Sequence, residues 1–369
     1  MTALEQPPEQ SDSGWSLPMR LLAGMAALVV VLAGMHAASS LLELLFLALF
    51  IGVITTPAFL WLRDRGVPTY LVLLFMASLL AAMLSVAVLV VSRALGSLAT
   101  QLPVYQETLR RYLVDWLEWL RSHGMDISVE EHQAVLDTTQ VLGLAGSGVA
   151  LVSQMFSQGF VVLLLVVFLW LEATVLPVKV RAVVSPDTWS GIHAGVVNVR
   201  RYMGMKTVMS LLTGALILAW SLLTGLDYPL LLGGLAFLLN FVPVVGSLVA
   251  SLPAIALALV GAGPGWALLV AGGYLVINVG VSNVIEPRYF GRGLGISALV
   301  VLLSMLFWGW VLGPIGMFLS VPLTRAVKLV VEGHEDTRWI GLLLSGGSPQ
   351  RIRQTIRMQQ VQAPESDSA

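Results

Sequence analysis

A polar interruption stands inside one of the most apolar parts of this sequence, at residues 237–246, which read FLLNFVPVVG. The Asn240 side chain carries both a hydrogen-bond donor and an acceptor. Pro243 lacks a backbone donor and prevents normal pairing with the carbonyl one turn earlier. Unpaired backbone groups are costly in hydrocarbon, so they persist only where they face protein, water or a solute. The stretch therefore predicts a broken membrane helix at which a polar ligand can bind.

Each residue of this break also has a plainer interpretation. Asn240 can bind a polar solute or a cation, or it can satisfy the backbone groups that Pro243 frees. We expect Pro243 and Gly246 to shape the break without contacting a solute through their side chains. Ser247 can contact a ligand, although serine in membrane helices more often packs against a neighbour or bonds its own backbone.

Five further polar residues extend the candidate pathway. Glu286 and Arg288 flank a proline at the end of a later apolar segment, and Glu286 can carry a coupling proton or ion. The alternative is an interfacial ion pair between Glu286 and Arg288 or Arg292. The remaining three are Lys206, which can hold an anionic group if it points inward, and Asn278 and Asn283, which stand five apart and so share no strict α-helical face.

Other kinds of chemistry have little support in the sequence. The chain has no cysteine, which excludes disulfides, thiol catalysis and cysteine-based metal sites. Its five histidines lack the spacing of metal ligands. We find no paired catalytic groups within the apolar segments and no phosphate-binding G-x-x-x-x-G-K-[ST] loop. We therefore expect no enzymatic activity, no metal and no cofactor, and the net charge of −1 gives no reason to expect a nucleic-acid partner.

The composition requires a lipid bilayer as the solvent for most of the chain. Of the 369 residues, 57% are hydrophobic and 11% are charged, and the mean hydropathy is +0.86. A soluble domain carries about 25% charged residues. Because only helices and closed barrels satisfy their backbone groups in lipid, the long apolar runs predict an all-α polytopic membrane protein with about eight hydrophobic segments.

The chain divides into five expected parts. They are a disordered cytoplasmic tail at 1–19, three transmembrane spans within 20–91, an extracytoplasmic helical insert at 92–150, a core of membrane segments at 151–332, and a polar cytoplasmic tail at 333–369. Lys and Arg gather in the loops at 63–65, 173–206 and 286–292 and after the last apolar run, which places both termini in the cytoplasm.

Two stretches of the core, 229–260 and 297–331, are too short to hold two full spans of about 20 residues each. Each has a Gly/Pro break near its middle and a Ser-x-Pro sequence after it. We expect two interrupted helical hairpins, re-entrant or fully crossing, that enter the membrane from opposite faces as an inverted repeat. The alternative is two ordinary kinked helix pairs with glycine packing.

The insert at 92–150 carries a heptad seam, a regular series of apolar and aromatic residues. The seam predicts either an oligomer contact outside the bilayer or a helix that packs on its own neighbours or lies at the level of the headgroups. Its positions step alternately by three and four residues: Leu95, Leu98, Leu102, Tyr105, Leu109, Tyr112, Trp116 and Trp119.

Four motifs in 200–332 resemble the autoinducer-2 exporter family of bacterial inner-membrane transporters, and its TqsA-like branch in particular. They are K-T-x-x-S-L-x-T-G from Lys206, N-F-V-P-x-x-G-S from Asn240, N-x-x-E-P-R-x-x-G-R from Asn283, and G-P-x-G-M-x-x-S-V-P-L from Gly313. The resemblance covers about a third of the chain closely, and elsewhere it rests on the order of segments.

The resemblance implies a secondary transporter in the bacterial inner membrane that exports autoinducer-2 or a related small polar signal. The partners it implies are the bilayer, a small polar solute and a coupling ion, H⁺ or Na⁺. Together with the heptad seam, it leads us to expect a homo-oligomer. Other family members are linked to sodium or proton antiport, so a monovalent cation/proton antiporter on the same scaffold is the alternative function.

Overall fold

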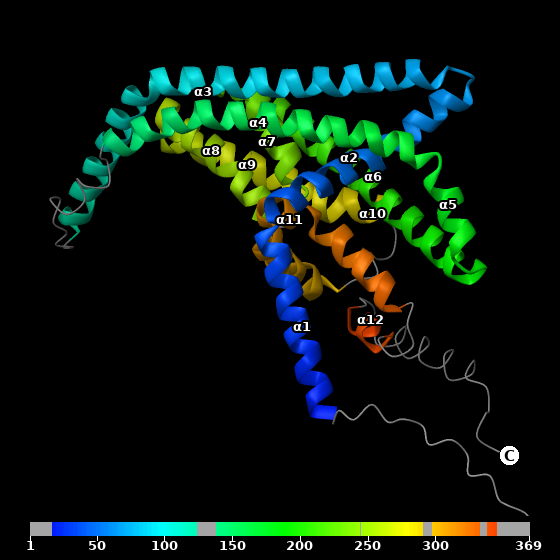
Figure 1. Ribbon diagram of the computed structural model, residues 1–369. Coiled ribbons are helices and arrows are strands. Elements are labelled where there is room, and N and C mark those ends of the chain that lie inside the picture. The colour runs from blue at the N-terminus through cyan, green and yellow to red at the C-terminus, as the bar shows by residue number, and fades with distance from the viewer. Residues whose placement is uncertain (1–16, 124–137, 244, 291–296, 333–337, 345–369) are drawn as a thin grey trace, which may run out of the picture.

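The computed structural model describes residues 17–123, 138–243, 245–290, 297–332 and 338–344, all of them helices and short connections (Figure 1). Residues 17–19 of the expected tail at 1–19 are helical, and its other residues, with most of the tail at 333–369, lie outside the described residues. The elements in chain order are α1 (Leu17–Ala37), α2 (Ser39–Asp64), α3 (Thr69–Ser122), α4 (Thr138–Ala173), α5 (Leu176–Val183), α6 (Pro186–Leu223), α7 (Pro229–Leu239), α8 (Val245–Ala262), α9 (Pro264–Val279), the π-helix η2 (Gly280–Ile285), α10 (Glu286–Phe290), α11 (Ala298–Glu332) and α12 (Arg338–Leu344).

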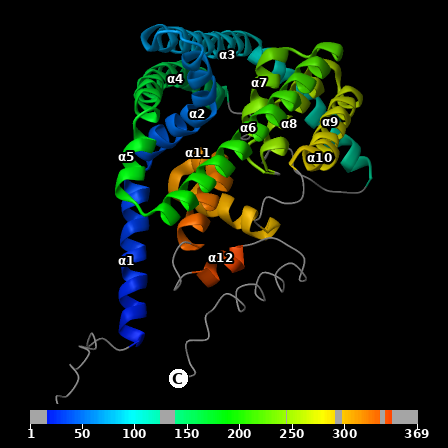
Figure 2. The same ribbon diagram turned by 90° about the vertical axis from the view of Figure 1, so that its right-hand side faces the viewer.

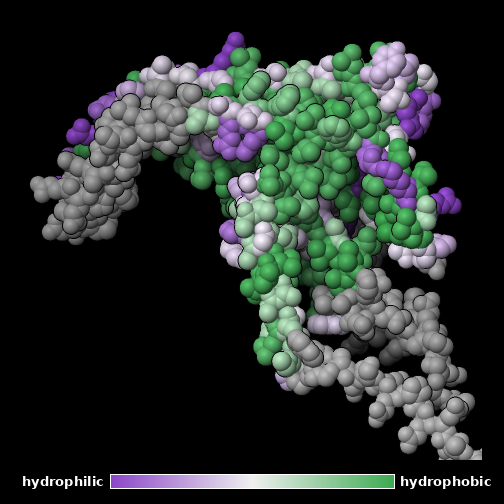
Figure 3. All heavy atoms as spheres, viewed as in Figure 1, coloured by the Kyte–Doolittle hydropathy of each residue, from purple (hydrophilic) through white to green (hydrophobic). Residues whose placement is uncertain are grey.

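The described chain is an all-α membrane protein, as predicted. Seven of its helices are long and apolar enough to cross a bilayer, and they lie in α2, α3, α4, α6, α8, α9 with its extension, and α11. The expected first span corresponds to a shorter apolar helix, Leu22–Ala37. Much of the surface is apolar (Figure 3), which fits side chains whose solvent is lipid and not water.

The third span and the insert form one helix, although the sequence suggested a boundary near residue 91. α3 runs without interruption for 54 residues and contains Pro103. It lies beside α4 for much of its length (Figure 1). A proline removes one hydrogen bond from a helix, and the helix α3 continues past Pro103. The predicted insert is therefore a continuation of two membrane helices in its described part, while residues 124–137 lie outside the described range.

Two seam positions pack on this chain itself. The Tyr105 hydroxyl donates to Asp227 Oδ2 at 3.1 Å, in the loop between α6 and α7. The Tyr112 hydroxyl lies against Gly263, between α8 and α9, where a Cβ would come within 3.2 Å of it. Trp119 is exposed. These contacts favour the interpretation in which the helix packs on its neighbours, and they leave the oligomer contact a prediction.

The first interrupted hairpin is formed by α7 and α8. The helix α7 ends at Leu239, Asn240 is its C-cap, and α8 begins at Val245. The two helices pack closely because Gly246 lies against the end of α7, where a Cβ would stand 1.8 Å from the Leu239 carbonyl oxygen. Gly246 thus shapes the break, as expected, by allowing two backbones to touch.

The second interruption lies within α11, where the chain also folds back. Leu312 and Gly313 have non-helical backbone angles, and φ of Gly313 is 62°. The indole N–H of Trp308 donates to Thr324 Oγ1 at 2.9 Å, although the two residues are 16 positions apart. In a straight helix that separation would span about 24 Å. Both predicted breaks therefore exist, while their depth and direction in a bilayer remain predictions.

The helices α6 to α9 form a packed group with a shared apolar core (Figure 2). Prolines at the first turns of α6, α7 and α9 favour starting a helix at those points, because an N-terminal residue needs no backbone donor there. The core is unusually rich in small side chains, which let the helices approach closely. Its alanines are Ala236, Ala250, Ala254, Ala258 and Ala267.

Candidate functional site

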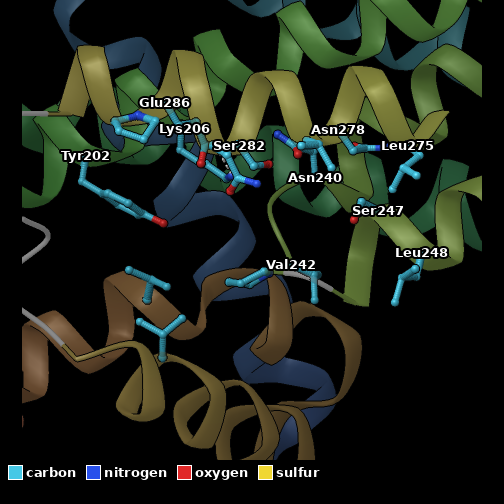
Figure 4. A pocket seen from close by; sticks show the side chains of 16 residues that line it. Tyr202, Lys206, Asn240, Val242, Ser247, Leu248, Leu275, Asn278, Ser282 and Glu286 are labelled. Atoms are coloured by element: carbon cyan, nitrogen blue, oxygen red, sulfur yellow. Dashed lines mark hydrogen bonds and ion pairs between the residues drawn. The ribbon is translucent and has the colours of Figure 1, made fainter. Parts of the chain in front are cut away.

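A cavity of about 630 Å³ opens beside the first break (Figure 4). Its polar wall comes from α6 with Lys206, the C-terminus of α7 with Asn240, α8 with Ser247, and α9 with the π-helix and α10 that follow it. The helix α11 closes it with the apolar side chains of Val301 and Val321. The break predicted from the sequence thus borders a space large enough for a small solute.

Asn240 is held in place by a second polar residue on α6. Its Nδ2 donates to Ser210 Oγ at 3.0 Å, and Asn240 and Ser210 are only 7% and 0% exposed. This bond fixes the orientation of the amide at the cavity wall. Because an asparagine amide has two N–H donors and a carbonyl acceptor, Asn240 retains hydrogen-bonding capacity for a ligand.

A close ion pair joins α6 to the end of the α9 segment. Lys206 Nζ lies 2.6 Å from Glu286 Oε1, and the two side chains are 12% and 20% exposed. The two charges neutralise each other, which lowers the cost of placing either beside lipid. The alternative interpretation of the sequence, an ion pair between Glu286 and Arg288 or Arg292, thus has a different partner in the structure, Lys206. Arg288 is exposed and outside the cavity lining, and Arg292 lies outside the described residues.

The segment between α9 and α10 is a π-helix, and this changes which residues share a face. Asn278 and Asn283 are nearly one and a half turns apart in an α-helix, so the sequence placed them on different faces. The wider i to i+5 turn of Gly280–Ile285 brings both to the cavity wall, with Ser282 beside them. Asn278 Nδ2 donates to the Tyr274 carbonyl oxygen at 2.8 Å, which orients its side chain.

The structure gathers seven of the nine predicted residues in the cavity wall: Lys206, Asn240, Pro243, Ser247, Asn278, Asn283 and Glu286. Gly246, which packs against Leu239, and Arg288 do not line the cavity. Sequence reasoning missed Ser210, Ser282 and Tyr202, the last of which lines the cavity and lies with its ring 5.3 Å from the Arg325 guanidinium. The four-residue steps from Tyr202 through Lys206 to Ser210 were the available signal, because such residues share a helix face.

The second break does not open on this cavity. Val311 and Leu312 are fully buried, in an apolar cluster that α1 and α2 help to form. Of the two breaks, the first alone borders this cavity, and the passage of a polar solute beside it stays a prediction. The described residues contain no group of three His, Asp or Glu that could hold a metal ion.

Comparison with known proteins identifies the fold that carries this cavity. The AI-2E family transporter model matches residues 25–334, which include every element of the cavity wall. The chain belongs to the AI-2E family of transporters.

Curated members of this family resemble the chain along nearly its whole length. The AI-2 transport protein TqsA of Escherichia coli K12 is 35% identical over 89% of this chain and 96% of its own. A putative transport protein, YhhT, of the same organism is 32% identical over 90% of this chain and 95% of its own. A putative transport protein of Haemophilus influenzae is 33% identical, over 88% and 96%. The chain is therefore a multi-pass membrane transporter.

Proposed function

We propose that this transporter exports a small, uncharged, hydroxyl-rich solute, autoinducer-2 or a close chemical relative, through the cavity at the first helix break. The observation that carries the proposal is the polar wall of that cavity. Its side chains offer amide and hydroxyl groups from Asn240, Ser247, Asn278 and Asn283, which can donate and accept hydrogen bonds. A polyol gives up hydrogen bonds to water when it enters the cavity, and these side chains can replace them.

The charges of the wall also fit a neutral cargo. Lys206 and Glu286 are paired with each other, so the pair contributes no net charge to the cavity. An uncharged solute avoids the desolvation that an unpaired ion would require. The similarity to a curated AI-2 transport protein supports the same class of cargo. We expect transport to be secondary, either facilitated or driven by an ion gradient, and both termini to face the cytoplasm of a bacterial inner membrane.

Monovalent cation/proton antiport is the second candidate function. It is favoured by the position of Glu286, a carboxylate whose partner is the Lys206 ammonium. A sodium ion or a proton could replace that ammonium, and Lys206 would then be released to another partner. The same exchange would serve as the coupling step of a solute exporter. We also expect a homo-oligomer, in which the exposed part of α3 contacts other copies.

The test uses purified protein in liposomes loaded with labelled autoinducer-2. We expect Asn240→Ala to lower efflux about fivefold or more, since a lost hydrogen bond is worth about 1 kcal/mol. Arg288→Gln is the matched control, because this residue lies outside the cavity, and it should keep normal efflux. Sodium and proton fluxes are followed in the same vesicles. Efflux by Asn240→Ala at the wild-type rate would refute this site, and ion flux without solute flux would favour the antiporter.

A further inference from the structure

A short helix, α5, lies at the edge of the molecule and joins α4 to α6 (Figure 1). The extended residue Val184 ends α5, and the Ser185 hydroxyl caps α6 by accepting a hydrogen bond from the Thr188 backbone N–H at 3.3 Å. The chain therefore turns sharply between the two helices. As a result Trp189, in the first turn of α6, lies beside side chains of α5.

The lengths of the neighbouring spans place α5 at a surface of the bilayer. The apolar span of α4 ends at Ala173, just before α5 begins. The apolar stretch of α6, Thr188–Leu223, has 36 residues. A helix of that length extends about 54 Å, whereas the hydrocarbon core of a bilayer is about 30 Å thick. The start of α6 thus extends past the hydrocarbon, and α5 lies with it at the level of the headgroups.

The helix α5 has the mixed surface of a helix that lies in a membrane interface. None of its residues is buried, and Val178 and Val183 are 69% and 86% exposed. The same two turns carry the basic residues Lys179 and Arg181. Exposed apolar side chains beside basic ones are typical of helices that lie between the headgroups and the acyl chains, where basic residues attract anionic lipids.

A groove of about 400 Å³ lies between α5 and the start of α6. The wall from α5 is a single helix face, because its positions are three or four residues apart. The side chains of the groove are apolar except for one guanidinium and one indole N–H. The lining residues are Pro177, Val178, Arg181, Ala182 and Trp189.

The Arg181 guanidinium is the charged group of this groove. It makes no hydrogen bond and no ion pair with the part of the chain that the structure describes. The other cation of α5, Lys179, is paired with Glu172 at 2.8 Å. Arg181 is therefore available to an anion from outside the protein, and its planar fork of donors matches two oxygens of a phosphate group.

We propose that this groove binds one anionic phospholipid. Its phosphate pairs with Arg181, and its glycerol and upper acyl chain pack on Val178, Ala182 and Trp189. Charge favours an anionic lipid over a zwitterionic one, because residues 174–201 contain four Lys or Arg and one Asp. Free inorganic phosphate would pair with Arg181 but would leave the apolar walls of the groove uncovered.

The bound lipid would hold the turn between α5 and α6 at the membrane surface. This turn precedes the helix that carries Lys206 to the cavity wall. The inference concerns lipid binding alone, so it stands or falls independently of the transported solute.

Melting temperatures in mixed micelles of detergent and lipid provide the first test. Phosphatidylglycerol is added in increasing amounts to protein in phosphatidylcholine micelles. A ligand that binds the folded protein raises its melting temperature. We expect this rise for the wild type, and we expect Arg181→Gln to need about tenfold more phosphatidylglycerol for the same rise, because a charge-assisted hydrogen bond is lost.

Lys179→Gln is the matched control, since it removes the same charge from the same helix but lies outside the groove lining. It should respond to phosphatidylglycerol like the wild type. In phosphatidylcholine alone, Arg181→Gln should melt at the wild-type temperature, because Arg181 is exposed. The proposal is overturned if Arg181→Gln responds like the wild type, if Lys179→Gln loses the response equally, or if inorganic phosphate alone gives the same rise.

The absence of cysteine from the sequence allows the groove to be probed directly. Val178→Cys places a thiol in the groove, and Val183→Cys places one on the same helix outside the lining. In liposomes, an uncharged maleimide should modify Val178→Cys about tenfold more slowly with phosphatidylglycerol than with phosphatidylcholine, as expected for a mostly occupied groove. Val183→Cys should react at similar rates in both lipids.

A double variant shows whether this protection depends on the guanidinium. When Val178→Cys is combined with Arg181→Gln, the two lipids should give nearly equal rates of modification. Equal rates for Val178→Cys with Arg181 intact would show that the groove does not select an anionic lipid. Protection that persists in the double variant would show that Arg181 does not bind the phosphate, and either result would overturn the proposal.

Discussion

The carboxylate of Glu43, on α2, lies directly against Gly313 at the break in α11. A Cβ on Gly313 would stand 3.1 Å from Glu43 Oε1. The glycine also has a φ of 62°, with ψ of −153°, a combination that side chains rarely adopt. The second break thus requires glycine for its backbone conformation, and the Glu43 carboxylate of another helix packs close to the same residue.

Gly313→Ala should therefore destabilise the protein. The new methyl group would be strained at this backbone conformation, at a cost on the order of 1–3 kcal/mol, and would crowd the Glu43 carboxylate. Thermal unfolding in detergent should show a lower melting temperature. Gly272→Ala is the control, because that glycine lies within α9 and its Cβ would meet nothing within 4 Å. Equal melting temperatures for the two variants would contradict this account of the break.

Replacing one member of the Lys206–Glu286 ion pair should destabilise the protein more than replacing both. Lys206→Met or Glu286→Gln alone leaves one charge without its partner in a mostly buried site, which costs about 1.5–3 kcal/mol. The double variant removes both charges and should recover part of that loss. The unfolding free energies of the wild type, the two single variants and the double variant give the coupling energy between Lys206 and Glu286.

The control for this cycle is a second ion pair of the same kind. Lys179 Nζ and Glu172 Oε1 are 2.8 Å apart, but their side chains are 61% and 48% exposed. An exposed pair contributes about 0–1 kcal/mol, because water and salt screen it. The same substitutions there should change stability little. A coupling energy for Lys206 and Glu286 no larger than that of the exposed pair would refute the role assigned to burial.

The fold and part of the site followed from local sequence patterns. Pro243 and Gly313–Pro314 mark the two breaks because a proline or a left-handed glycine affects the helix at its own position. The spans followed from hydropathy, since a run of apolar side chains needs lipid whatever its neighbours are. Asn240 was identified for the same reason: it is a polar residue inside an apolar run.

Long-range partners and local helix geometry could not be predicted in this way. Lys206 and Glu286 are 80 positions apart, so their pairing depends on how α6 packs against the end of α9. The π-helix depends on packing as well, and without it Asn278 and Asn283 do not share a face. The second break looked equivalent to the first in sequence, yet it packs against α1 and α2, in an apolar cluster with the Glu43 carboxylate beside it, and it does not border the cavity.

The contact between Tyr105 and Asp227 predicts a dependence of stability on alkaline pH. Burial, followed by the hydrogen bond to the Asp227 carboxylate, raises the pKa of Tyr105 to about 12. An unfolded tyrosine has a pKa of about 10. Between these values the folded protein retains a proton that the unfolded chain has lost, so stability falls as the pH rises. The contribution is complete below about pH 10 and is lost by about pH 12.

Tyr105→Phe should abolish this part of the pH dependence, because phenylalanine has no proton to retain. Chemical unfolding of both proteins in detergent, from pH 9 to 12, measures it as the difference in slope. Tyr70→Phe is the matched control, since Tyr70 is exposed and should leave the slope as it is in the wild type. Tyr105→Phe also removes the hydrogen bond from α3 to the loop between α6 and α7, so this variant should be less stable than the wild type already at pH 7. If its stability equals that of the wild type at every pH, α3 does not hold this loop through Tyr105.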